Sequence, residues 1–291
     1  MEITANCGRD PEGAFERSDP SSRSQIPVVI LCGGMGTRIR ESSERLPKPM
    51  IDIGGRPILW HIMKLYGHHG FRRFVLCLGY RAWDVKEYFL RYRENLADFT
   101  VDLKGSDGVQ FHGDDDAEDW EVTCVDTGIV TGTGGRIGRI RHHIDEPHFL
   151  LTYGDGIGDV DLGLEWDIHR AHDRLGTVTV VHPTSRFGEV NIDGDVAADF
   201  AEKPTAGGWV SGGFFAFDHG FFEYLSDGVD LFLEQGPLQQ LARDRQLAVF
   251  RHEGFWMGMD TYREHVELNR LWSQDQAPWK VWTDARPAHR I

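Results

Sequence analysis

The chain has 291 residues and a formal net charge of −15, from 31 Lys and Arg against 46 Asp and Glu. This acidic balance argues against a nucleic-acid partner, which would need a basic surface for the phosphate backbone. No stretch approaches the roughly 18 apolar residues of a membrane-spanning helix, so we also expect no membrane partner. The length suits one large domain or two small ones.

Residues 1–26 are polar and rich in Ser, Pro and Gly, and they contain no apolar segment of the kind that a secretory signal needs. We expect this N-terminal extension to be disordered, residues 27–283 to form a single domain, and residues 284–291 to form a C-terminal tail. The four cysteines share no C-x-x-C spacing. Free thiols in the reducing cytoplasm are the simpler interpretation.

Strands and helices alternate through the first two thirds of the chain. The expected strands are 27–32, 73–80, 121–128, 148–156 and 177–183, and the expected helices are 57–70, 82–96 and 161–176. This alternation predicts an α/β fold in which a mostly parallel, twisted sheet is flanked by helices on both faces.

The pattern changes after residue 183, where we expect a small β subregion. The expected elements are a hairpin over 187–204, a strand over 209–218, helical segments over 219–226 and 237–245, a strand over 247–252, and a final helix over 261–272. Residues 104–120 form the most polar internal stretch. We expect a solvated loop there, because the acidic run 114–116 matches no metal-binding loop.

The first strand runs into Gly33-Gly34-Met35-Gly36, a turn that often binds phosphate. It matches neither the P-loop nor the dinucleotide fingerprint, whose third glycine is missing. Read as structure alone, the glycines make a tight turn between a strand and a helix. Thr37 and Arg38 favour a phosphate site, because they add a hydroxyl donor and a planar guanidinium.

Lys48 lies between two prolines in the segment Leu46-Pro-Lys-Pro-Met. A rigid backbone around this flexible side chain is useful if the Lys48 ammonium must point in one direction. Two cations ten residues apart suit a reaction in which charge moves between phosphate groups.

Such a site needs a divalent metal and therefore carboxylates. Asp155 follows an apolar strand, at the edge where open α/β sheets bind ligands. Asp260 lies where an apolar segment gives way to the final helix. Either residue could instead be a helix N-cap, and this alternative is strongest for Asp260.

The motifs GGMGTR, PKPM, YGDG, FGEV, EKP and MDT occur in this order. Together they resemble the sugar-1-phosphate nucleotidylyltransferase family, and most closely its glucose-1-phosphate cytidylyltransferases, over roughly residues 27–283. The resemblance implies a Rossmann-like nucleotidyltransferase fold with a small sugar-binding β subregion, and a homo-oligomer. It also implies a reaction that transfers a nucleotidyl group from CTP to a sugar 1-phosphate, here α-D-glucose 1-phosphate. The products would be a CDP-sugar and pyrophosphate, and the cofactor would be Mg²⁺.

The resemblance also implies a role for each motif residue. The nucleotide would be bound by Leu31, Gly33, Gly34, Gly36, Thr37, Arg38, Lys48, Thr133, Gly134 and Arg136. Catalysis would rest on Arg38, Lys48 and Asp155. The metal would be held by Asp155 and Asp260. The sugar phosphate would be bound by Glu202, Lys203, Ser211, Gly212 and Gly213.

Two departures from the cytidylyltransferase pattern alter the expected sugar site, because Ser211 replaces an Asn and Gly236 replaces a Glu. A site that hydrogen-bonds hydroxyls discriminates strongly between substrates. Another sugar phosphate, or another NTP such as dTTP, UTP or GTP, therefore stays an alternative. A non-catalytic sugar-nucleotide sensor is a second alternative, and the complete set of cations and carboxylates argues against it. An NAD-dependent enzyme is disfavoured by the missing third glycine.

Overall fold

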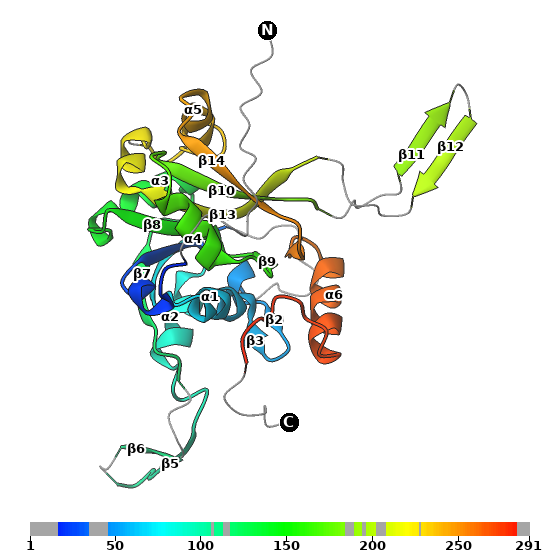
Figure 1. The fold of residues 1–291 in the computed structure, drawn as a ribbon. Coiled ribbons are helices and arrows are strands. Elements are labelled where there is room, and N and C mark those ends of the chain that lie inside the picture. Colours follow the sequence, from blue (N-terminus) through cyan, green and yellow to red (C-terminus); the bar gives the residue numbers. More distant parts are fainter. Residues whose placement is uncertain are drawn as a thin grey trace.

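The computed structural model describes residues 17–34, 46–105, 108–112, 117–183, 189–193, 196–201, 208–226 and 228–283. A seven-stranded sheet forms its centre, in the order β14-β10-β13-β8-β1-β4-β7 (Figure 1). Its strands are β1 (Pro27–Leu31), β4 (Arg73–Leu78), β7 (Glu121–Asp126), β8 (His148–Tyr153), β10 (Gly176–Val181), β13 (Val210–Asp218) and β14 (Leu247–His252). Neighbouring strands are parallel except around β13, which runs antiparallel to both β10 and β8. The mostly parallel sheet predicted from the sequence is confirmed.

Helices cover both faces of this sheet. Val28 and Ile30 of β1 face one core, and Val29 and Leu31 face the other, because successive side chains of a strand alternate. The first core includes residues of α1 (Ile58–His68), α2 (Ala82–Leu90), α4 (Leu162–Arg170) and α6 (Tyr262–Ser273). The second includes residues of α3 (Thr133–Arg139), α5 (Pro237–Arg243) and the 3-10 helix η4 (His219–Tyr224). Burial on both faces explains why β1 is a continuous apolar run.

Several expected elements differ in extent. The helix expected over 82–96 ends at Leu90, and the helix expected over 161–176 ends at Arg170. Part of the loop expected over 104–120 is instead a strand, because β5 (Asp98–Val101) and β6 (Val109–His112) form a hairpin that extends from the body (Figure 1). Phe99 pairs with Phe111 across this hairpin, and aromatic cross-strand pairs stabilise such ladders. The acidic run 114–116 lies outside the described residues.

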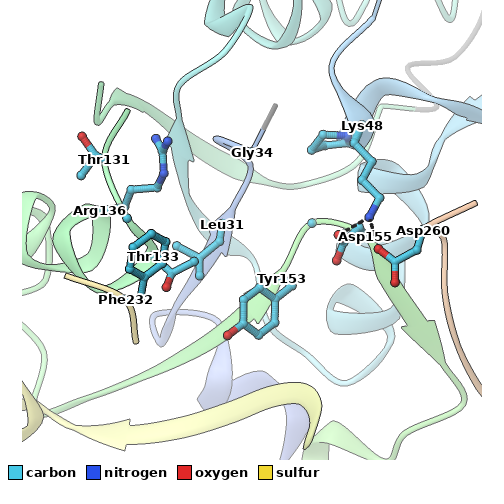
Figure 2. A pocket seen from close by; sticks show the side chains of 13 residues that line it. Leu31, Gly34, Lys48, Thr131, Thr133, Arg136, Tyr153, Asp155, Phe232 and Asp260 are labelled. Carbon is cyan, nitrogen blue, oxygen red and sulfur yellow. Dashed lines mark hydrogen bonds and ion pairs between the residues drawn. The ribbon is translucent and has the colours of Figure 1, made fainter. Parts of the chain in front are cut away.

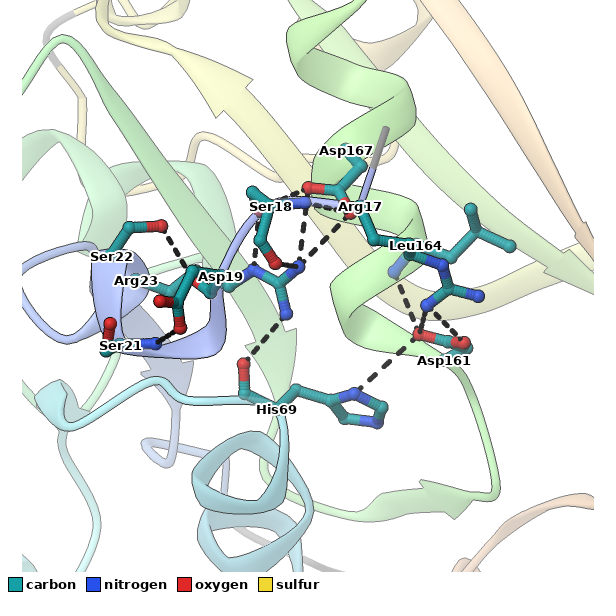
Figure 3. Close-up of polar contacts among 10 residues, drawn as sticks. All are labelled: Arg17, Ser18, Asp19, Ser21, Ser22, Arg23, His69, Asp161, Leu164 and Asp167. Atoms are coloured by element: carbon teal, nitrogen blue, oxygen red, sulfur yellow. Dashed lines mark hydrogen bonds and ion pairs between the residues drawn. The ribbon is translucent and has the colours of Figure 1, made fainter. Parts of the chain in front are cut away.

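The fold begins before Pro27, where the sequence led us to place its start. Residues 17–26 pack against the body through Arg23, which is 3% exposed. Its guanidinium donates to the Ser18 carbonyl (2.9 Å), the His69 carbonyl (3.0 Å) and the Asp167 carboxylate (3.1 Å), as Figure 3 shows. A buried guanidinium needs such partners. The expectations for residues 1–16 and 284–291 concern segments outside the described residues.

Short strands complete the architecture. They pair as β2 (Asp52–Ile53) with β3 (Arg56–Pro57), β9 (Gly156–Gly158) with β15 (Trp256–Gly258), and β11 (Glu189–Asp193) with β12 (Val196–Ala201). The last pair confirms the hairpin predicted over 187–204, whose turn lies outside the described residues. In the part of the chain that the structure describes, no helix is long and apolar enough to cross a membrane.

Candidate active site

Lys48 lies between two carboxylates at the carboxyl edge of the sheet. Its Nζ donates to Oδ2 of Asp155 (2.5 Å) and to Oδ1 of Asp260 (2.8 Å), as Figure 2 shows. Lys48 begins a short 3-10 helix, η2 (Lys48–Met50), which is closed by a bond from the Met50 amide to the Pro47 carbonyl (2.8 Å). Because proline fixes its own φ, the prolines on either side of Lys48 give it the rigid frame that the sequence suggests.

The Lys48 side chain is largely buried, with 13% of its surface exposed. Burial alone would lower the pKa of its ammonium, but Asp155 and Asp260 outweigh that effect and hold the pKa above its usual value. The lysine is therefore charged at neutral pH. One ammonium therefore faces two carboxylates at this cluster.

The backbone fixes the spacing of the two carboxylates. Asp155 lies between β8 and β9, and Asp260 follows β15. Strand β15 pairs with β9 so that Gly258 lies opposite Gly156. The Met259 amide then donates to the Asp155 carbonyl at 2.8 Å. Two segments that lie far apart in the chain are thus joined directly beside the site.

The structure decides between the two interpretations of Asp260. The N-cap of α6 is Thr261, whose hydroxyl accepts from the Glu264 amide (3.4 Å). The Glu264 carboxylate accepts in return from the amides of Thr261 (2.8 Å) and Asp260 (2.6 Å). This reciprocal arrangement is a capping box. The Asp260 side chain is therefore not the cap, and it contacts Lys48 instead.

The donor set of the pair fits a hard divalent cation. Among the described residues, no group of three or more His, Cys, Asp or Glu is placed to hold a metal. Two carboxylates alone suit Mg²⁺, which is usually bound through one or two carboxylates, substrate phosphates and water. Asp155 and Asp260 each have 37% of their side-chain surface exposed, so a cation can reach them.

A first cavity of about 400 Å³ opens beside this cluster. It is lined by several residues that the resemblance assigned to the nucleotide, namely Leu31, Gly34, Lys48, Thr133 and Arg136. Of the other five predicted residues, Gly36, Thr37 and Arg38 lie outside the described residues, and Gly33 and Gly134 do not line the cavity. The structure therefore brings together one half of the predicted nucleotide site.

Arg136 supports the glycine turn from within the protein. Its side chain is buried, and its two terminal nitrogens lie within hydrogen-bond distance of four carbonyl oxygens and the Thr127 hydroxyl. One of these carbonyls belongs to Gly33 (3.0 Å). A Cβ atom at Gly33 would lie 2.1 Å from the guanidinium carbon. Gly33 thus makes room for Arg136, which we regard as a residue that positions the turn.

At the glycines around Thr133, an added Cβ atom would likewise meet protein atoms rather than open space. A Cβ atom at Gly134 would lie 2.8 Å from the Leu231 side chain, and one at Gly132 would lie 2.5 Å from the Leu231 carbonyl. These glycines explain why helix α3 was not predicted, because glycine is a poor helix former. The close packing of helix α3 against residues 228–236 outweighs the low helix propensity of these glycines.

A second cavity, also of about 400 Å³, shares Tyr153, Asp155 and Asp260 with the first as lining residues. The predicted sugar-site residues Ser211, Gly212 and Gly213 line it. Gly213 has φ +79°, and a Cβ there would meet the Tyr153 ring at 2.8 Å. The glycine is thus required by its conformation and by Tyr153. The predicted residues Glu202 and Lys203 lie outside the described residues.

Tyr153 and Glu234 are site residues that the sequence did not single out. The Tyr153 hydroxyl donates to one oxygen of Glu234, whose other oxygen accepts from the Thr133 hydroxyl (3.0 Å). Burial and this carboxylate raise the pKa of Tyr153. Tyr153 lines both cavities. Its position directly before the Gly-Asp of YGDG was a usable signal, whereas nothing in the sequence pairs it with Glu234.

The site lies at the carboxyl ends of parallel strands, where open α/β folds bind nucleotides. Residues 27–271 match the sequence profile of the family described as nucleotidyl transferase, and the chain belongs to this family. It is 42% identical to the "Probable glucose-1-phosphate cytidylyltransferase" of Bacillus subtilis (strain 168) over 257 residues, which cover 88% of this chain and 100% of that protein. It is also 42% identical to the glucose-1-phosphate cytidylyltransferase of Salmonella typhi over 259 residues, with the same two coverages.

The solved structures agree on the fold. The crystal structure of HddC from Yersinia pseudotuberculosis complexed with GMP-PN has a TM-score of 0.61 at 21% identity, covering 85% of this chain and 99% of that one. The Rossmann-like nucleotidyltransferase fold that the resemblance implied is therefore confirmed.

Proposed function

We propose that the chain transfers a cytidylyl group from CTP to α-D-glucose 1-phosphate, giving CDP-glucose and pyrophosphate. One observation carries the proposal. The two cavities share Asp155 and Asp260, and both carboxylates contact Lys48. A nucleotide in the first cavity and a sugar phosphate in the second would therefore meet at this cluster. The choice of CTP and glucose 1-phosphate is supported by the cytidylyltransferases that share 42% of their residues with this chain.

The residue types suit this chemistry. A phosphate oxygen of the sugar phosphate attacks the α-phosphorus of CTP, and the bond from that phosphorus to the bridging oxygen breaks as pyrophosphate leaves. The attacking oxygen is already anionic, so no general base is required. The Lys48 ammonium compensates charge on the reacting phosphates, and the two cavities hold the substrates in place.

We infer that the cofactor is Mg²⁺ and that Asp155 and Asp260 are its protein ligands. When bound, it would supply further neutralisation of phosphate charge. From the resemblance we also assign Arg38 to the triphosphate, and Glu202 and Lys203 to the sugar phosphate.

We further infer a homo-oligomer in the cytoplasm. A reducing compartment suits the free thiols of Cys32, Cys77 and Cys124. The oligomer is an inference from the family resemblance.

A matrix of nucleotides and sugar phosphates tests the proposal. The full chain is incubated with CTP, UTP, GTP or dTTP, with glucose, mannose or galactose 1-phosphate, and with Mg²⁺, and pyrophosphate release is measured. We expect the highest kcat/KM with CTP and glucose 1-phosphate, and no release in the presence of excess EDTA. A higher kcat/KM with another pair would contradict the substrate assignment. No release with any pair would overturn the proposed activity, and tight ligand binding without turnover would then support the non-catalytic sugar-nucleotide sensor.

A further inference from the structure

Residues 228–236 contribute Phe232 to the lining of the first cavity and are hydrogen-bonded to the start of helix α3. Three hydrogen bonds make the attachment: Gly132 N to Val229 O (2.7 Å), Gly135 N to Leu231 O (3.1 Å) and Leu233 N to the Thr133 hydroxyl (2.8 Å). The contact is close at the level of the backbone, because a Cβ atom at Gly135 would lie 2.7 Å from the Gly228 carbonyl. We call residues 228–236 the wall segment.

The wall segment turns a large aromatic side chain outward. Leu233 is fully buried, whereas Phe232 is 46% exposed and lines the first cavity. An exposed aromatic side chain on a rigid backbone offers a flat surface at a low entropic cost. The attachment of the segment to α3 places this surface on the cavity.

The two ends of the first cavity differ in charge. Figure 2 shows Phe232, Thr133 and Leu31 together, apart from Lys48, Asp155 and Asp260. Arg136 also lies at the Phe232 end, but its guanidinium is engaged with protein oxygens. One end therefore holds the Lys48 ammonium and the two carboxylates that would hold a metal for the phosphates, and the other end offers apolar and neutral surface for a base.

We propose that the nucleobase of the bound NTP stacks on Phe232, and that the wall segment holds this ring in place. This assignment rests on the proposed function of the same site. Every nucleobase has a π face, so stacking on an aromatic ring tolerates any base. Phe232 then supplies affinity for the base without selecting among bases.

Direct binding to the full chain tests the assignment. Titration calorimetry with Mg²⁺ measures the Kd of CTP, UTP, GTP and dTTP, and of inorganic triphosphate, which has no base. Phe232→Ala is expected to weaken the best-bound nucleotide about tenfold, equivalent to about 1.4 kcal/mol, and to leave triphosphate binding unchanged. Phe232→Tyr keeps a ring and is expected to bind as the wild type does. Phe99→Ala is the matched control, because Phe99 is 48% exposed on the β5–β6 hairpin outside the first cavity.

Three outcomes would overturn the assignment. Phe232→Ala could bind the nucleotide as tightly as the wild type does. It could weaken triphosphate as much as the nucleotide, which would show that Phe232 acts through the fold. A wild-type chain that binds none of the four nucleotides would overturn it as well. By contrast, a wild type that binds nucleotides but makes no CDP-glucose overturns the proposed function alone, because the stacking test uses binding.

Discussion

Asp260 and Thr261 are adjacent, yet the structure gives them different tasks that mutation can separate. Asp260 contacts Lys48, and Thr261 caps helix α6. We expect Asp260→Asn to abolish turnover with little change in stability. We expect Thr261→Ala to lower stability and to leave turnover near that of the wild type.

The magnitudes follow from the contacts. Thr261→Ala removes one cap bond to the Glu264 amide, and the bonds that the Glu264 carboxylate accepts remain. The cost is about 1 kcal/mol, or a fall of about 2–4 °C in Tm for a chain of this size. Asp260→Asn keeps the shape of the side chain but removes one of two charges that would hold a metal. Losing several kcal/mol of charge stabilisation corresponds to a fall in kcat of about a thousandfold or more.

Pyrophosphate release at saturating CTP and glucose 1-phosphate measures kcat, and differential scanning calorimetry measures Tm. The reasoning would be refuted if Asp260→Asn kept full activity while losing as much Tm as Thr261→Ala. Raising the Mg²⁺ concentration gives a second readout. Because Asp260→Asn weakens metal binding by removing a charge, we expect more metal to restore part of the lost activity.

Three further predictions concern the surroundings of the site. Gly34→Ala is expected to raise the KM for CTP several-fold at unchanged Tm, because among the described residues no atom beyond its chain neighbours lies within 4 Å of the added methyl group. Gly33→Ala is expected to lower Tm because its methyl group meets Arg136. Arg23→Ala leaves Asp167 as a buried charge without this partner, and we expect it to reduce the free energy of unfolding by about 3–5 kcal/mol. Burial raises the pKa of Glu165 to about 8 in the folded chain. As pH rises from about 4.5 to 8, the unfolded chain releases this proton while the folded chain keeps it, so the free energy of unfolding falls. We therefore expect the Tm of Glu165→Gln to exceed that of the wild type by an amount that grows over this range.

Each of these has a control or a contradicting result. For Arg23, the control is Arg17→Ala, which breaks an exposed pair with Asp161 and is expected to cost under about 1 kcal/mol; equal losses would contradict the buried-pair argument. For Gly34, a Tm loss as large as that of Gly33→Ala would show a structural role. For Glu165, a Tm difference from the Gln variant that is the same at pH 5 and pH 8 would show that the carboxyl group does not titrate in this way.

The sheet was predictable from the sequence because local sequence patterns determine where its strands begin and end. Strand β14 has the predicted bounds, and β13 begins one residue after its predicted start. Helix ends were less predictable, as α2 and α4 show, because their last turns depend on packing. Helix α3 was missed because its glycines are explained by contacts with residues 228–236, about a hundred residues further along the chain.

The candidate site was partly predictable for the same reason. Asp155 and Lys48 have local signals, an apolar strand before one and prolines around the other. The ambiguity at Asp260 could have been reduced from the sequence, because Thr261 with Glu264 three residues later is the capping-box pattern. The link between Tyr153 and Glu234 joins positions 81 apart, and no local pattern encodes it.

Gly33 and Gly34 of the first motif have different roles, and the difference bears on where a ligand can bind. Gly33 faces Arg136 from a position 103 residues away in the chain, so a side chain there would collide with protein whether or not a nucleotide binds. Gly34 lines the cavity, and within the part of the chain that the structure describes a Cβ added to it would meet no atom within 4 Å beyond its chain neighbours. Of these two glycines, Gly34 is therefore the one whose missing side chain leaves space for a ligand, and the phosphate interpretation of the motif rests on it rather than on Gly33.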